Sequence, residues 1–133
     1  MTSCDDPIGI FHSGIGGLTI MREIVKCLPF ENMVYFGDTA RLPYGDKSAK
    51  TILRYTLENV SFLIEQKIKF LVLACFTASS YALDVLQQKL SIPVIGVLQS
   101  GFEELMAATV SKRVAILGTS STIQSGALQS LIQ

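Results

Sequence analysis

The sequence has little of several features that would point to a particular class of partner. Its charges balance, because eleven lysines and arginines are matched by eleven aspartates and glutamates. Without a basic excess or a polybasic run, nucleic acid and membrane surfaces are poor candidate partners. The longest strongly apolar run, Phe70 to Phe76, is much too short to cross a bilayer. Internal repeats and low-complexity segments are also missing from the sequence.

Cysteine and histidine are scarce as well. The three cysteines, Cys4, Cys27 and Cys75, are odd in number and widely spaced, which gives neither a disulfide framework nor a metal site. His12 is the only histidine. The first residues, MTSCDDP, are acidic and unlike a secretory leader. We therefore expect a soluble protein of the reducing cytoplasm with no bound metal.

What the sequence does contain is a regular alternation of short apolar runs and helical patterns. At 133 residues, 49% of them hydrophobic, the length by itself suggests one domain with a real core. The apolar runs predict five strands and the helical spacing predicts helices around Leu18–Leu28 and Leu53–Ile64. The expected strands are Ile8–Phe11, Met33–Phe36, Phe70–Ala74, Val94–Val97 and Val114–Leu117. This order predicts an α/β fold whose parallel sheet is flanked by helices on both faces.

Polar residues follow several of the predicted strands. The segments are HSG after the first strand, GDTARLPYG after the second, CFTAS after the third and GTSST after the fifth. Because the carboxyl ends of parallel strands share one edge of the sheet, these segments should meet there, and ligands bind in the crevice at that edge. The sequence therefore predicts a ligand site built of hydroxyls and backbone amides.

The glycines of SGIGG follow a strand and open a helix, so a dinucleotide-binding loop has to be considered. The spacing does not fit, because Thr19 stands where the third glycine or alanine belongs. No acidic residue is well placed after the second strand to bind a ribose. The loop can still offer backbone N–H groups at a helix N-terminus to a carboxylate or phosphate oxygen.

Cys75 and His12 are the candidate chemical groups, each at a junction after a strand. The positive end of a helix stabilises the thiolate of a cysteine placed there, although a buried structural cysteine explains Cys75 equally well. If the first and third strands are neighbours, His12 could accept the thiol proton, or it could only hydrogen-bond to nearby backbone. For Asp38 and Arg41, bracing of a loop is favoured over substrate binding.

Taken together, the motifs resemble the glutamate racemases of bacterial cell-wall synthesis. The segments that carry the resemblance are GIFHSGIGGLTIMREI, VYFGDTARLPYG, VLACFTASSYAL, IPVIGVL and LGTSSTIQSG, and they run from about Ile8 to Gly126. The resemblance implies a flavodoxin-like racemase domain, residues 1–98, and the opening of a second similar domain, residues 99–133. It also implies a cofactor-independent interconversion of L- and D-glutamate in the cytoplasm, supplying D-glutamate for peptidoglycan, and a homodimer.

The resemblance assigns roles to individual positions. Cys75 matches the first of two cysteines that transfer protons on opposite faces of glutamate, as general acid–base catalysis requires. The positions that match substrate contacts are Ser13, Tyr44, Gly45, Phe76, Thr77, Thr119 and Thr122.

The sequence also departs from the family pattern. His12 replaces an aspartate that helps to activate the first cysteine, Phe76 replaces an asparagine, and Gln99-Ser100 replaces a Glu-Pro pair. The second catalytic cysteine of the family lies in a Cys-Thr-His motif beyond residue 133. The last residues, LQSLIQ, carry no helix stop signal, which favours a shortened chain. Two hypotheses remain: a fragment of an active racemase, or a degenerate protein that binds a dicarboxylate or a protein partner.

Overall fold

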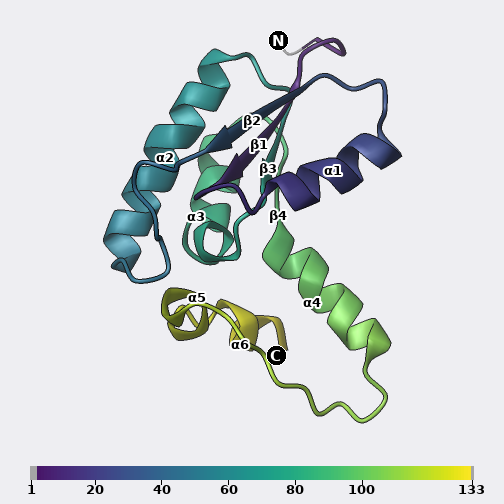
Figure 1. Ribbon diagram of the computed structural model, residues 1–133, viewed down its shortest axis with the longest axis vertical. Coiled ribbons are helices and arrows are strands. Elements are labelled where there is room, and N and C mark those ends of the chain that lie inside the picture. The colour runs from purple at the N-terminus through teal and green to yellow at the C-terminus, as the bar shows by residue number, and fades with distance from the viewer. Residues whose placement is uncertain (1–2, 133) are drawn as a thin grey trace.

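A four-stranded parallel sheet forms the centre of the protein (Figure 1). The computed structural model describes residues 3–132. The strands are β1 (Ile8–His12), β2 (Met33–Gly37), β3 (Phe70–Leu73) and β4 (Val94–Gly96), in the order β2-β1-β3-β4. All three strand pairs are parallel. The predicted α/β architecture is confirmed. The first and third strands are neighbours, which is the condition under which His12 and Cys75 lie at adjacent strand ends.

The described residues also contain six helices. They are α1 (Leu18–Cys27), α2 (Ala49–Glu65), α3 (Phe76–Lys89), α4 (Val97–Ala108), α5 (Ser120–Gln124) and α6 (Ala127–Ile132). Among them, none combines the length and the apolar character that crossing a membrane requires. The predicted boundary between residues 98 and 99 falls inside α4, and the division into two domains stays a prediction.

Helices cover both faces of the sheet, as the apolar strands predict. On one face, α2 and α3 pack against β1 and β3 around a core that includes Phe11, Leu63, Leu71 and Leu86. On the other face, α1 packs on a smaller cluster that contains Ile10. Figure 1 shows the two helices to the left of the sheet and α1 to its right. The main core therefore lies between the sheet and the α2–α3 pair.

The fifth predicted strand, Val114–Leu117, is wrong. Residues 113–119 have no regular secondary structure, and Leu117 is fully open to solvent, with 99% of its surface exposed. A β-strand is stabilised by hydrogen bonds to a neighbouring strand, and the described chain places none beside this segment. The apolar pattern indicates that this segment can form a β-strand, but a strand also needs a neighbouring strand to hydrogen-bond with.

The predicted ends of the other strands shift by one residue. The first two strands each continue one residue further, to His12 and Gly37, because the ladder between β1 and β2 extends to this pair. The third strand stops at Leu73, and the fourth stops at Gly96 because α4 begins at Val97. These shifts leave the polar segments at the predicted edge of the sheet.

Candidate active site

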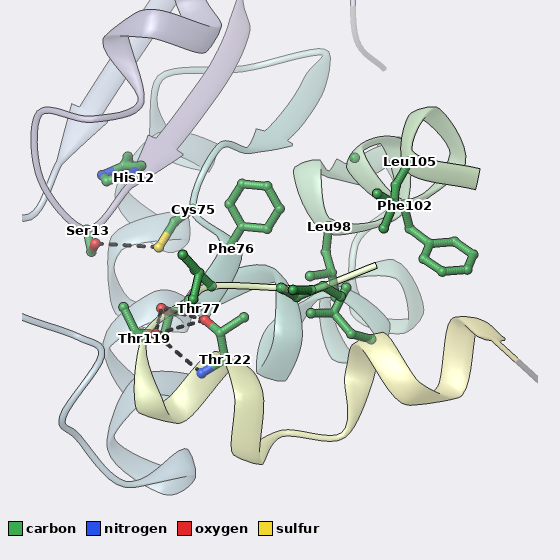
Figure 2. A pocket seen from close by; sticks show the side chains of 16 residues that line it. His12, Ser13, Cys75, Phe76, Thr77, Leu98, Phe102, Leu105, Thr119 and Thr122 are labelled. Carbon is green, nitrogen blue, oxygen red and sulfur yellow. Dashed lines mark hydrogen bonds between the residues drawn. The ribbon is translucent and has the colours of Figure 1, made fainter. Parts of the chain in front are cut away.

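A cavity of about 540 Å³ opens at the carboxyl edge of the sheet. It is lined by the end of β1 and the residue after it, by Cys75 and the start of α3, by α4, by the segment leading into α5, and by α5 and α6 (Figure 2). The lining residues are His12, Ser13, Cys75, Phe76, Thr77, Leu98, Gly101, Phe102, Leu105, Ala115, Ile116, Leu117, Gly118, Thr119, Thr122 and Leu128. Seven of the nine positions predicted from the sequence are among them.

Cys75 lies between the end of β3 and the start of α3. It is the N-cap of α3, and its Sγ accepts a hydrogen bond from the backbone N–H of Ala78 at 3.5 Å. The Ser13 hydroxyl lies 3.4 Å from the same sulfur, and either group can donate. The thiol is buried but faces the cavity. A helix N-terminus and a hydroxyl donor both stabilise a thiolate, which suits a group that takes up a proton.

His12 lines the same cavity, but its hydrogen bond goes elsewhere. The imidazole Nδ1 accepts from the backbone N–H of Gly14 at 2.8 Å. Burial is the largest influence on the imidazole and lowers the pKa of His12 below its usual value. The polar side-chain partner of Cys75 is therefore Ser13, and a Cys75–His12 pair stays a prediction.

Three threonine hydroxyls form the floor of the cavity below Cys75. The Oγ1 atoms of Thr77 and Thr119 are 3.0 Å apart, those of Thr77 and Thr122 are 3.1 Å apart, and those of Thr119 and Thr122 are 2.9 Å apart. Thr119 also caps α5 by accepting from the backbone N–H of Thr122. These hydroxyls can donate to or accept from a ligand, because each rotates to suit its partners. The arrangement fits recognition of a carboxylate or an amino group.

The opposite wall of the cavity is apolar. Phe76 is half-exposed and its ring lies near Gly101 of α4. Leu98, Phe102 and Leu105 of α4 continue this wall, as Figure 2 shows. None of the lining residues within 3–132 is a lysine, arginine, aspartate or glutamate. A charged ligand would therefore be held by hydroxyls and backbone amides rather than by an ion pair.

Tyr44 and Gly45 are the two predicted residues that do not line the cavity. The Tyr44 side chain is buried in the core, where its hydroxyl donates to Asp38 Oδ2 at 2.6 Å. Gly45 lies behind Thr119: a Cβ atom at Gly45 would come within 2.6 Å of the Thr119 Cβ. Both residues support the site from outside, and their role as direct substrate contacts stays a prediction.

The interpretation of Asp38 and Arg41 as a loop brace is confirmed. Asp38 Oδ2 accepts from Tyr44, from Asn59 Nδ2 at 2.9 Å and from Arg41 Nε at 2.7 Å. Arg41 also binds Glu58 and Asn59 on α2. The network therefore joins the loop after β2 to α2, outside the cavity.

The sequence reasoning missed the residues that carry the apolar wall and those that hold α5. The apolar α4 side chains follow a helical pattern that is equally typical of core packing. The sequence therefore holds no signal that distinguishes cavity-lining residues from core residues. The sequence does not single out Ser121, because a serine next to the threonines of GTSST has no distinctive spacing. Its buried environment becomes visible only in the folded structure.

Comparison with known proteins gives a consistent result. The Asp/Glu/hydantoin racemase family matches residues 11–133. A glutamate racemase of Geobacter metallireducens is 56% identical over 126 residues, which are 95% of this chain and 47% of that protein. The chain thus spans about half the length of the curated relatives it matches.

Solved structures show the same relationship. A glutamate racemase from Bacillus anthracis aligns with a TM-score of 0.92 and 40% identity, over 96% of this chain and 48% of that one. A glutamate racemase from Francisella tularensis, solved in complex with D-glutamate, aligns with a TM-score of 0.88 and 41% identity, again over 96% and 48% of the two chains.

Proposed function

Because this chain belongs to the Asp/Glu/hydantoin racemase family, we propose that it provides one half of a glutamate racemase site. Cys75 carries the chemistry: its sulfur faces the cavity at the N-terminus of α3, beside the Ser13 hydroxyl. The threonine hydroxyls hold the carboxylate and amino groups of the substrate. The reaction needs no cofactor, takes place in the cytoplasm and supplies D-glutamate for peptidoglycan.

The proposed step is a proton transfer from the α-carbon of glutamate to the Cys75 thiolate. The Cα–H bond breaks, an S–H bond forms, and the electron pair stays on the substrate, delocalised into its carboxylate. Ser13 and the Ala78 N–H stabilise the sulfur while it is charged. Inversion requires a second acid that protonates the opposite face, since one group cannot easily reach both faces of a planar carbanion.

In this chain the other two cysteines are in no position to supply that second acid. Cys4 and Cys27 are exposed and lie outside the cavity. By resemblance, the second cysteine belongs to a Cys-Thr-His motif beyond residue 133, in a second racemase domain that begins near residue 99. We propose that the complete enzyme, a homodimer in keeping with the family, unites both thiols.

The apolar ring of Phe76, at a cavity position where the family has an asparagine, favours a second candidate function. A site with a single thiol can bind glutamate or another dicarboxylate without inverting it, or serve as a protein-interaction module. The two candidates differ in a measurable way, because only proton transfer exchanges the α-hydrogen with solvent.

The experiment follows each glutamate enantiomer in deuterated water by the α-proton NMR signal and by optical rotation. We expect exchange of the α-proton of one enantiomer, D-glutamate by analogy with the family, without inversion. Cys75→Ser should abolish exchange, while Cys27→Ser, an exposed cysteine on α1, should leave it intact. Binding without any exchange would favour the second candidate, and exchange that persists in Cys75→Ser would remove Cys75 from the mechanism.

A further inference from the structure

The hydroxyls of Thr119 and Thr122 reach the cavity from a short, weakly supported element. The preceding segment, residues 113–119, has no regular secondary structure, and α5 itself is five residues long. Such a helix is not stable in isolation, because its nucleation cost is not recovered over so few residues. Contacts with the rest of the protein must therefore fix these two hydroxyls beside Thr77.

Ser121 makes those contacts. It is buried, and its Oγ lies 2.6 Å from the Gly45 carbonyl oxygen and 3.0 Å from the Lys47 carbonyl oxygen. Its backbone N–H donates to the Gly45 carbonyl at 3.1 Å. Its own carbonyl accepts from the Tyr81 hydroxyl of α3 at 2.7 Å. A single residue thus joins α5 to the loop after β2 and to α3.

The loop that receives Ser121 is itself held firmly. Tyr44, next to Gly45, is anchored by its hydrogen bonds with Asp38 and Asn59. The absence of a side chain at Gly45 lets the loop approach Thr119, because a Cβ atom there would come within 2.6 Å of the Thr119 Cβ. The loop therefore offers a fixed surface with two carbonyl acceptors against which α5 docks.

We propose that Ser121 is a positioning residue that sets the Thr119 and Thr122 hydroxyls against Thr77 in the cavity. Ser121 does not line the cavity, and it acts on a bound ligand through its neighbours in α5. The ligand-binding part of this inference rests on the proposed function. Without the Ser121 hydroxyl, α5 loses its side-chain hydrogen bonds to the loop. The hydroxyls of Thr119 and Thr122 then no longer stay within hydrogen-bond distance of Thr77.

The test compares Ser121→Ala with Ser120→Ala, the adjacent exposed serine of the same helix. Threonine methyl ¹H–¹³C NMR spectra report the positions of Thr77, Thr119 and Thr122, and titration with D-glutamate reports affinity. We expect Ser121→Ala to shift the methyl signals of Thr119 and Thr122 and to weaken D-glutamate binding about tenfold, the scale of one lost buried hydrogen bond. Ser120→Ala should change neither.

A merely structural role gives a different result. If Ser121→Ala lowers the unfolding temperature but leaves the threonine methyl signals and the affinity unchanged, the inference is wrong. If the unaltered protein binds no D-glutamate, the proposed function fails, while the methyl signals still decide the role of Ser121. Should Ser121→Ala not fold, Tyr81→Phe removes the second link to Ser121 and is expected to shift the same signals.

Discussion

Asp38 is a buried carboxylate whose charge is balanced by the groups around it. Burial alone would raise the pKa of Asp38, but hydrogen bonds from Tyr44 and Asn59 and the guanidinium of Arg41 outweigh burial and hold the pKa below its usual value. Burial and the neighbouring Asp38 carboxylate raise the pKa of Tyr44, because both oppose its ionisation, and they outweigh Arg41 and Asn59, which lower it. The charged form of Asp38 and the neutral form of Tyr44 are thus tied together.

This pairing predicts how stability depends on pH. Because the folded pKa of Asp38 lies below the value of about 3.9 for an unfolded chain, the carboxylate stabilises the fold fully above that value. The contribution is lost as the pH falls through the folded pKa. Asp38→Asn should cost about 1–3 kcal/mol at pH 7 and flatten the acid dependence.

Urea unfolding from about pH 7, where the carboxylate is fully charged, down to about pH 2.5, where it becomes protonated, measures both effects. Asp84→Asn, at an exposed position on α3, serves as the control and should keep the acid dependence of the unaltered protein. An Asp38→Asn profile parallel to that of the unaltered protein would contradict the role of Asp38.

Phe76 gives a second prediction at the scale of a residue. Its ring is half-exposed in the cavity, and the resemblance to the family places an asparagine at this position, which would add one hydrogen-bond partner. Phe76→Asn should tighten D-glutamate binding by about two- to tenfold, the net worth of one hydrogen bond. Calorimetric titration measures the change. Phe62→Asn, an equally exposed phenylalanine of α2 outside the cavity, should leave affinity as it is.

At the scale of elements, the start of α1 lies tightly against the end of β1. A Cβ atom at Gly17, the N-cap of α1, would come within 2.6 Å of the His12 Cβ and 3.0 Å of the Tyr35 hydroxyl. The Tyr35 hydroxyl in turn donates to the Gly14 carbonyl at 2.6 Å. The turn that carries Ser13 is therefore held between a strand end and a helix start.

Gly17→Ala should push α1 away from His12 and lower the free energy of unfolding by about 1–3 kcal/mol. Gly101→Ala is the matched comparison. Gly101 lies within α4, and a Cβ atom there would be 3.5 Å from the Phe76 ring, an ordinary van der Waals contact. That change should be neutral or stabilise the protein by up to about 1 kcal/mol. Thermal unfolding of both variants measures this difference. Equal decreases in the free energy of unfolding would mean that the structure accommodates a Cβ atom at Gly17 without destabilisation.

At the scale of the whole molecule, the sequence predicts that the polar segments after the parallel strands meet at one edge of the sheet, where the structure places Ser13, Cys75 and Thr77. That prediction succeeds because apolar runs and the polar residues after them are local signals with a fixed geometric meaning in parallel sheets. The prediction of a strand at Val114–Leu117 is wrong because strand pairing depends on a partner that is distant in the sequence. The contacts of Ser121 and the buried position of Tyr44 cannot be predicted from local sequence patterns, because both depend on residues that are distant in the sequence.

The wide spacing of the site along the chain has a consequence for how the protein folds. Ser13 meets Cys75 across 62 positions, Thr77 meets Thr122 across 45, and Gly45 meets Ser121 across 76. Closing such long loops costs entropy that is recovered only after the sheet and the α2–α3 layer exist. We therefore expect the cavity to form after the core, with the docking of α5 as a late step in folding.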